Sequence, residues 1–158
     1  MLIKKGDRIP SASFKTMGKD GPQDINTDDI FKGKKVVLFA VPGAFTPGCS
    51  QTHMPGFVVK LDEIKAKGVD TVACTAVNDV FVMDAWQKNQ NAEHILMLAD
   101  GNGDFAESIG LALDLSAGGL GKRSKRYAMI VDDGVVSWIG IDDKGVEQSS
   151  ADSVLAEL

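Results

Sequence analysis

Three runs of apolar residues divide the first two thirds of the chain: 34–42, 70–77 and 94–100. The first is rich in β-branched residues, and none of the three alternates regularly with polar positions. Continuous runs of this kind are typical of strands that are buried on both faces of a sheet. The pattern therefore predicts a central sheet.

Two segments between these runs predict helices that cross from one strand to the next. In the first segment Gly68 marks the expected end, and the apolar residues that recur at helical spacing are Phe57, Leu61 and Ile64. The second segment, 78–91, offers Asn78 and Asp79 as helix caps. Its expected apolar face consists of Phe81, Val82, Ala85 and Trp86.

The pattern changes after residue 125. Two apolar runs, 126–131 and 135–140, flank an Asp-Asp-Gly sequence, and an Asp-Gly pair at this place predicts a tight turn between antiparallel strands. A last short helix is expected at about 150–157, with Ser149 or Ser150 as its cap. The end of the chain therefore predicts a hairpin followed by a helix.

The order β-α-β-α-β-β-α predicts an α/β protein of thioredoxin-like architecture. Such a protein has a central mixed β-sheet flanked by helices, here with an N-terminal extension. The chain has 158 residues, enough to bury about two thirds of its unfolded surface. We expect residues 1–158 to form a single domain.

Charge and cysteine content narrow the possible partners. The net charge is −5, which would repel nucleic acid and anionic membrane surfaces. Residues 1–14 lack a long apolar stretch and a small-residue cleavage site, so we expect a soluble, cytoplasmic protein. Two cysteines are too few to hold a secreted fold of this size together, and they predict chemistry or packing instead.

Cys49 lies at the expected start of a helix. Thr46 is a favourable N-cap residue and Pro47 suits the first helical position, which places Cys49 in the first turn. Unpaired amides and the helix dipole there favour a thiolate over a thiol. Pro55 interrupts the helical pattern, so we expect a short turn, a kink and then the longer helix. The alternative is that Cys49 is only a small buried apolar residue.

Several reactions would suit such a thiol. The chain has no Cys-x-x-Cys pair, so dithiol exchange lacks its second thiol, whereas oxidation by a peroxide needs only one. A cysteine hydrolase or transferase would use His53 as its base, one helical turn away. Against that alternative, we expect His53 to be a partly exposed helix residue. A redox sensor or binding module is the non-enzymatic alternative.

The residues around this thiol carry a family resemblance. The segment "VPGAFTPGC" resembles the peroxiredoxin pattern Pro-x-x-x-Thr-x-x-Cys at Pro42, Thr46 and Cys49, and "KRYAMIVDDG" looks like the strand that carries the family's active-site arginine, here Arg126. Nearly the whole chain is similar to the type II peroxiredoxins, the subfamily of the fifth peroxiredoxin. The resemblance implies a thiol peroxidase that reduces hydrogen peroxide and alkyl hydroperoxides, with peroxynitrite as a further candidate.

The resemblance also implies a role for each of these residues. Cys49 would attack the peroxide and become a sulfenic acid. Arg126 would hold the thiolate and orient the peroxide, and the amides of Gly48 and Cys49 would bind its departing oxygen. Thr46 would accept from the peroxide or donate to the sulfur, and Pro42 would shield the sulfur from water. No metal, flavin, haem or other cofactor is implied.

The second thiol departs from the mammalian pattern. Those enzymes resolve the sulfenic acid with a cysteine near the C-terminus, where this chain has Gln148 and Ser149. Cys74 matches the second cysteine of plant members and is a possible resolving thiol, but its apolar run predicts a core residue. An external thiol, glutathione with glutaredoxin or else thioredoxin, would then complete the cycle. The resemblance also implies a homodimer with edges near residues 44–48 and 78–83.

Two further motifs are weaker. Residues 101–106 fit Gly-x-Gly-x-x-Ala, but they follow the third strand and lack an acidic ribose ligand, so we expect a turn and a short helix. The basic segment 118–126 resembles a phosphate loop without its Ser or Thr. We expect it to be a solvated loop or a funnel for an anionic substrate.

Overall fold

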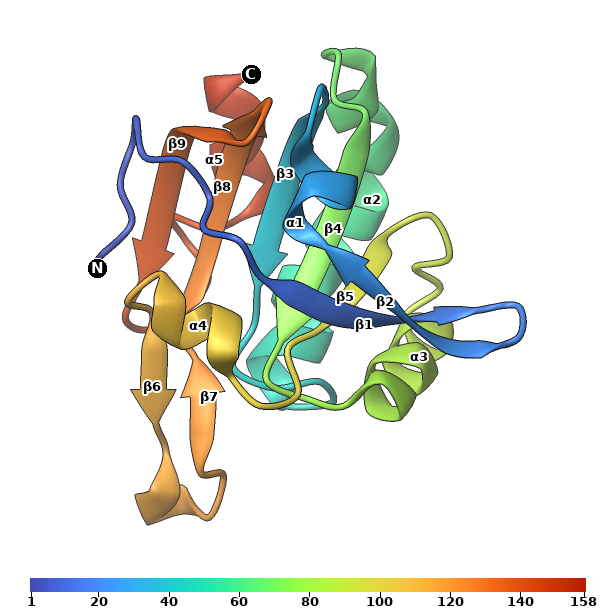
Figure 1. Ribbon diagram of the computed structural model, residues 1–158, viewed down its shortest axis with the longest axis vertical. Helices are drawn as coiled ribbons and strands as arrows, with labels where there is room; N and C mark the ends of the chain where they lie inside the picture. Colours follow the sequence, from blue (N-terminus) through green and yellow to red (C-terminus); the bar gives the residue numbers. More distant parts are fainter.

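The computed structural model describes residues 1–158 and is built on one seven-stranded sheet in the order β2-β1-β5-β4-β3-β8-β9 (Figure 1). These strands are β1 Ser13–Gly18, β2 Gly21–Asn26, β3 Lys35–Ala40, β4 Thr71–Ala76, β5 Leu96–Ala99, β8 Arg126–Asp132 and β9 Val135–Asp142. The three predicted apolar runs are β3, β4 and β5, which pair in parallel at the centre. The predicted α/β fold with a central mixed β-sheet is therefore confirmed.

The predicted hairpin is β8 and β9, which pair antiparallel, and β8 pairs antiparallel with β3 on its other side. Its turn contains Asp133 at φ 45° and Gly134 at φ 81°. Two successive positive φ values are what a tight turn between twisted strands needs, and Asp-Gly supplies them at low cost. The turn chemistry predicted from the sequence therefore fixes the position of β9 beside β8.

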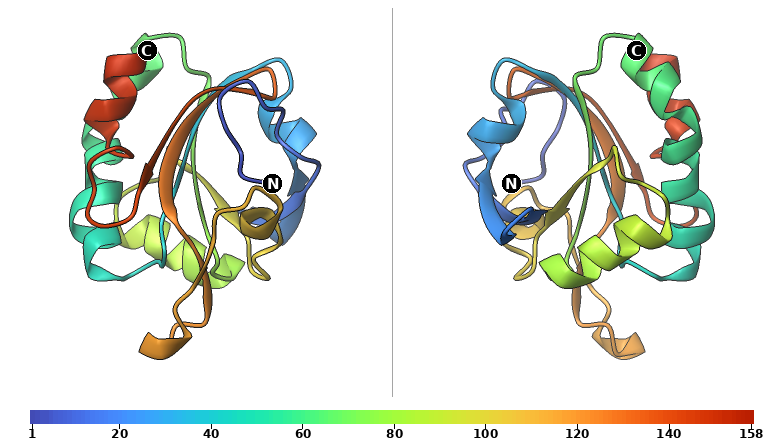
Figure 2. Two further views of the ribbon diagram at one scale, coloured as in Figure 1. Left: turned by 90° about the vertical axis from the view of Figure 1, so that its left-hand side faces the viewer. Right: turned by 90° about the vertical axis from the view of Figure 1, so that its right-hand side faces the viewer.

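Helices cover both faces of the sheet (Figure 2). On one face lie α2 (Met54–Ala66), α3 (Val80–Asn89) and α5 (Ala151–Glu157), and on the other lie α1 (Thr27–Phe31) and α4 (Asp104–Ser108). The two predicted crossover helices and the last helix are thus confirmed, and Ser150 is the cap of the last, accepting from the Ser153 amide.

Each face of the sheet carries its own apolar core, which explains the continuous apolar runs. In β3, Val37 and Phe39 point into the core beneath α2, α3 and α5, while Val36 and Leu38 point into the core beneath α1 and α4. A strand with apolar residues on both sides has no polar alternation to show.

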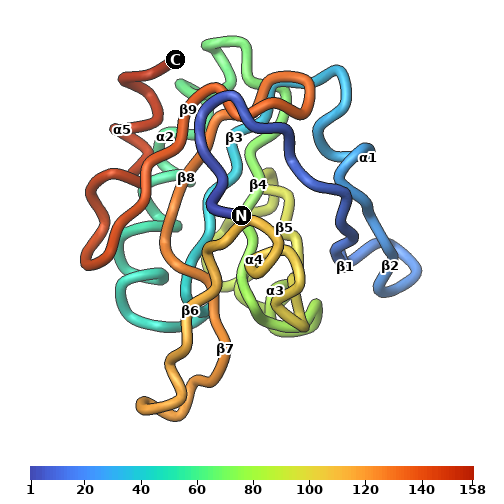
Figure 3. Tube along the Cα trace, turned by 60° about the vertical axis from the view of Figure 1, so that its left-hand side comes forward, coloured from blue at the N-terminus to red at the C-terminus, as the bar shows by residue number.

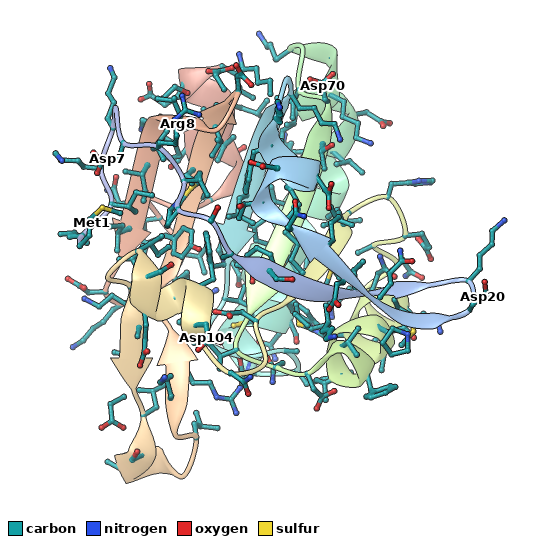
Figure 4. The ribbon with its side chains drawn as sticks, viewed as in Figure 1. Met1, Asp7, Arg8, Asp20, Asp70 and Asp104 are labelled. Carbon is teal, nitrogen blue, oxygen red and sulfur yellow. The ribbon has the colours of Figure 1, made fainter.

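The N-terminal extension contributes more than the sequence pattern predicts. Strands β1 and β2 form a hairpin that joins the sheet through β5, where Lys15 pairs with Ala99. Asp20 lies at the tip of this hairpin, away from the rest of the chain (Figure 4). All but one of the β2 residues are polar, glycine or proline, and β2 lies at the sheet edge, so its sequence lacks the apolar signal of a central strand.

The basic segment also has structure of its own. Strands β6 (Ala112–Asp114) and β7 (Lys122–Ser124) form a small ribbon around a 3-10 turn, η2 (Ser116–Gly118), and the ribbon extends beyond the body of the protein (Figure 3). Lys122 forms an ion pair with Glu107. Residues 101–106 form the expected turn and short helix, with Gly103 at φ 76° before α4.

The predicted apolar face of α3 was partly wrong. Its buried residues are Val80, Met83 and Trp86, whereas Phe81 is 65% exposed and Ala85 is also exposed. The Asp79 side chain caps the helix by accepting from the Val82 amide, and this start places every third residue from Val80 against the sheet. No helix in the structure is both long and apolar enough to span a bilayer.

Candidate active site

The sheet brings the thiol and the arginine to the same edge. Strand β3 ends at Ala40, which pairs with Tyr127 of β8, so Arg126 lies beside the point where the chain leaves β3 toward Cys49. Because β8 runs antiparallel to β3, its first residue lies at the carboxyl end of the parallel strands. Open α/β sheets usually build their sites at that end.

The turn that carries Cys49 differs from the predicted one. Helical backbone begins at Pro47 as expected, but the Thr46 hydroxyl donates to the Gly43 carbonyl at 2.6 Å instead of capping the helix. Residues Cys49–His53 then form a π-helical turn, η1, which runs directly into α2. The expected separate turn and kink are therefore replaced by one continuous, locally widened helix.

Pro55 explains the widening. A proline cannot donate to the carbonyl four residues before it, and its ring clashes with that carbonyl in a regular α-helix. In η1 the Met54 amide instead donates to Cys49, five residues back, and Pro55 lies in the first turn of α2. The π turn thus accommodates the proline within a continuous helix, and such turns occur frequently at functional sites.

Cys49 is fully buried, yet it does not have the surroundings of an ordinary core thiol. Nη2 of Arg126 lies 3.2 Å from its sulfur. The amides of Gly48 and Cys49 donate to no backbone carbonyl. A side chain on Gly48 would place its Cβ 3.2 Å from the same Nη2 atom, so glycine leaves room for the guanidinium. A fixed cation and two unpaired amides beside the thiol favour negative charge there.

The remaining predicted residues lie around this pair. Pro42 and Arg126 both line a cavity of about 170 Å³, together with Lys125 and Lys144. The Thr46 hydroxyl has its proton committed to Gly43, so toward a ligand it can only accept a hydrogen bond. The structure therefore places Pro42 and Arg126 on the same cavity and leaves Thr46 one of its two predicted roles.

His53 corrects the sequence-based expectation, because it is only 1% exposed. Its Nδ1 lies 2.8 Å from Nη1 of Arg126, and its Nε2 lies 2.9 Å from the Ser149 carbonyl. Burial and the charge of Arg126 lower its pKa from 6.5 to about 4. Both ring nitrogens are occupied by these partners, so this geometry does not support His53 as the base of a cysteine hydrolase.

Cys74 lies on β4 in the same apolar core as Cys49, and both are free thiols. It is fully buried, and burial together with the nearby Cys49 raises its pKa well above the ordinary value. A thiol that stays protonated attacks a sulfenic acid slowly. These surroundings are those of a core residue.

Trp86 is a neighbour of the site that the sequence pattern did not reveal. Its indole N–H donates to the Ser50 hydroxyl at 2.9 Å, which ties α3 to the turn that carries Cys49. No sequence motif marks this contact, since it joins residues 36 positions apart. The sequence placed Trp86 on the apolar face of this helix but did not reveal its link to the site.

Comparisons with known proteins agree with this geometry. The redoxin family matches residues 4–155. Peroxiredoxin-2D of Arabidopsis thaliana is 43% identical over 99% of this chain and 98% of its own length, and the chloroplastic peroxiredoxin-2E of the same plant is 44% identical over 99% of this chain and 69% of its own length.

Solved structures of peroxiredoxins are also similar to this chain. Reduced Prx3 of Vibrio vulnificus, crystallised in complex with hydrogen peroxide, has a TM-score of 0.96 and 50% identity, with 99% of both chains covered. Peroxiredoxin 5 of Alvinella pompejana has a TM-score of 0.85 and 37% identity over 98% of this chain and 96% of its own.

A thiol held by an arginine at the end of a thioredoxin-like sheet defines the class, and the chain belongs to the redoxin family. Its relatives at 42–44% identity are peroxiredoxins, and this protein is a peroxiredoxin, a thiol-dependent peroxidase.

Proposed function

We propose that Cys49 is the peroxidatic residue and that it reduces hydrogen peroxide, alkyl hydroperoxides and peroxynitrite. The thiolate attacks one peroxide oxygen, the O–O bond breaks, and the second oxygen takes up a proton and leaves as water or an alcohol; with peroxynitrite the group that leaves is nitrite. Cys49 is oxidised to a sulfenic acid. The observation that carries this proposal is the 3.2 Å contact between the Cys49 sulfur and Nη2 of Arg126.

The neighbours of the sulfur have complementary parts in this reaction. Arg126 keeps the thiolate charged and orients the peroxide, while the amides of Gly48 and Cys49 stabilise the charge that develops on the departing oxygen. Thr46 accepts a hydrogen bond from the peroxide, since its own proton is directed to Gly43. Pro42 keeps bulk water from the sulfur.

We further propose that a small anionic thiol, glutathione with glutaredoxin, reduces the sulfenic acid in preference to thioredoxin. The support is electrostatic. The cavity beside Arg126 is lined by Lys125 and Lys144 and by two carboxylates, Asp142 and Asp143, so that positive charge is in excess there. Arg123 lies over Gly43 nearby, and neither it nor the two lysines form an ion pair with a carboxylate. In a protein of net charge −5, such a cluster attracts carboxylates locally.

The rest of the proposed cycle follows from burial and exposure. Cys74 stays a core thiol, because it is buried and its pKa is raised, so resolution comes from outside the chain.

Phe45 is 50% exposed and Phe81 is 65% exposed, and these two aromatic residues support a homodimer through the segments 44–48 and 78–83. We place the reaction in the cytoplasm, where thiol pools are reducing.

The first experiment separates the chemical step from turnover. Reduced Cys74→Ser protein is mixed with one equivalent of hydrogen peroxide, and oxidation is followed by stopped-flow tryptophan fluorescence. We expect rapid oxidation that disappears in the protein that carries Cys49→Ser as well. Oxidation no faster than that of a free thiol would overturn the peroxidatic assignment.

The second experiment tests the reductant. We expect glutathione with glutaredoxin to sustain turnover better than thioredoxin does, and the advantage to shrink as salt is added. Replacing either Lys125 or Lys144 by glutamine should raise the glutathione concentration needed for half-maximal rate, whereas Lys19→Gln, at the far hairpin, serves as the matched loss of one charge. Equal or better turnover with thioredoxin would refute the preference.

A further inference from the structure

His53 is a buried titratable residue beside Cys49 that the proposed reaction does not use. It lies in η1 on the same turn as Cys49, and its ring packs against Phe39 and Phe57 with centroid separations of 5.1 and 5.6 Å. Phe39 and Phe57 are themselves stacked at 4.0 Å. This aromatic packing fixes the plane of the imidazole before any hydrogen bond is considered.

The partners of the two ring nitrogens determine the tautomer. Arginine can only donate, so the Nη1 group 2.8 Å from Nδ1 makes that nitrogen the acceptor. The proton of the neutral ring is then on Nε2, which donates to the Ser149 carbonyl at 2.9 Å. The ring is therefore neutral, and the lowered pKa of about 4 agrees with that state.

The Ser149 carbonyl is itself held in place by Asp142. This carboxylate accepts from the amides of residues 147, 148 and 149 and from the Ser149 hydroxyl, at 2.6 to 3.1 Å. Burial alone would raise the pKa of Asp142, but these hydrogen bonds outweigh it, and the pKa lies below its ordinary value. A chain of hydrogen bonds thus runs from Asp142 through Ser149 and His53 to Arg126.

The charge on Arg126 depends on this arrangement. Asp142 lies directly opposite Arg126 in the β8–β9 pair, yet the two form no ion pair, because the carboxylate is occupied by the loop that follows β9. The guanidinium has a neutral imidazole on one terminal nitrogen and the sulfur on the other. Its positive charge is therefore available to the thiolate and the peroxide.

We propose that His53 is a positioning residue, which aims the Arg126 guanidinium at Cys49 through Nδ1 without neutralising it, and that Asp142 fixes His53 by holding the Ser149 carbonyl. This inference rests on the proposed role of Cys49 and extends it to two residues that never touch the peroxide. The functional link in the chain is the acceptor at Nδ1. The hydrogen bond from Nε2 to the Ser149 carbonyl, which Asp142 holds in place, sets the direction in which Nδ1 points.

Two amide substitutions separate the acceptor from the donor. The side-chain amide of asparagine reaches the place of Nδ1 and can accept from Arg126, whereas that of glutamine reaches the place of Nε2 and can donate to Ser149. We expect His53→Asn to oxidise within about 3-fold of the wild-type rate and His53→Gln to be slower by about 10-fold or more, since small misplacements of a positioning group cost this much. His94→Gln is the matched control.

The readouts are the rate of Cys49 oxidation by hydrogen peroxide and the thiolate content of Cys49 at neutral pH, measured by ultraviolet absorbance in Cys74→Ser protein. Both should fall together in His53→Gln, and Asp142→Asn should show a smaller fall of both. Equal rates and thiolate contents in both His53 variants and the wild type would overturn the inference.

Other outcomes are equally decisive. Slow oxidation of the wild-type protein itself would instead overturn the role of Cys49. If His53→Gln does not fold, Asp142→Asn alone decides, because an unchanged thiolate content in that variant contradicts the chain of hydrogen bonds.

Discussion

Removing the titratable group at position 53 should change how the stability of the folded protein depends on pH. His53 is neutral in the folded state because burial and the charge of Arg126 disfavour its protonated form, with the Ser149 carbonyl and Asp142 opposing that effect only in part. The substitution His53→Asn deletes the titration while keeping a hydrogen-bond acceptor toward Arg126. The comparison therefore isolates the cost of protonating one buried ring.

The structure fixes the sign and the size of the effect. The unfolded chain protonates His53 below about pH 6.5, whereas the folded protein does so only below about pH 4, so the unfolded state binds more protons between these values. The stability that the neutral His53 ring contributes to the folded protein is fully present above pH 6.5 and is lost as the pH falls toward 4. A pKa lowered from 6.5 to about 4 corresponds to about 3 kcal/mol.

Urea unfolding followed by circular dichroism measures this directly. Between about pH 7 and pH 4, the free energy of unfolding of the wild-type protein should fall by about 3 kcal/mol more than that of His53→Asn. His94→Gln, which removes the only other histidine, should follow the wild type. Parallel curves for the wild type and His53→Asn would refute the assignment of a neutral, buried imidazole.

Three further predictions concern the surroundings of the site. Gly48→Ala places a carbon 3.2 Å from the active-site guanidinium, so stopped-flow oxidation should slow by about 10-fold with little change in the melting temperature. Ser50→Ala leaves the Trp86 indole N–H without its acceptor and should lower the free energy of urea unfolding by about 1–2 kcal/mol; no loss would contradict the contact. Phe81→Asp should yield monomers in analytical ultracentrifugation, while Val59→Asp, at an apolar position that is even more exposed, should not.

The centre of the fold could be predicted because its signals are local. Continuous apolar runs identify β3, β4 and β5, and the Asp-Gly pair identifies the β8–β9 turn. Strand β2 escaped prediction because an edge strand needs few apolar residues. The outward position of Phe81 escaped because the apolar spacing of α3 fits two overlapping faces, and only contact with the sheet decides between them.

The active site likewise contains residues that local sequence predicts and one whose surroundings it does not. The sequence predicted Cys49, Thr46 and Pro42 from a local motif and Arg126 from a strand that resembles the family's, and the structure brings the thiol and the arginine together. His53 was visible as a histidine, but its burial depends on Phe39 and Ser149, which are distant in sequence. Local spacing cannot report such contacts, so it predicted a partly exposed residue.

The replacement of an expected ion pair by a neutral acceptor explains why the C-terminal loop matters to the thiol. Arg126 and Asp142 are opposite each other in a strand pair, where opposite charges would normally attract. If they paired, the guanidinium would be partly neutralised and less able to hold a thiolate. The loop after β9 prevents this by binding the Asp142 carboxylate with three amides and a hydroxyl. The Ser149 carbonyl of the same loop then orients His53, whose neutral ring contacts Arg126 in place of the carboxylate. The seven residues that follow Asp142 thus keep its carboxylate from pairing with Arg126 and supply the Ser149 carbonyl that orients His53, so the two effects should be lost together in any variant that unfolds this loop.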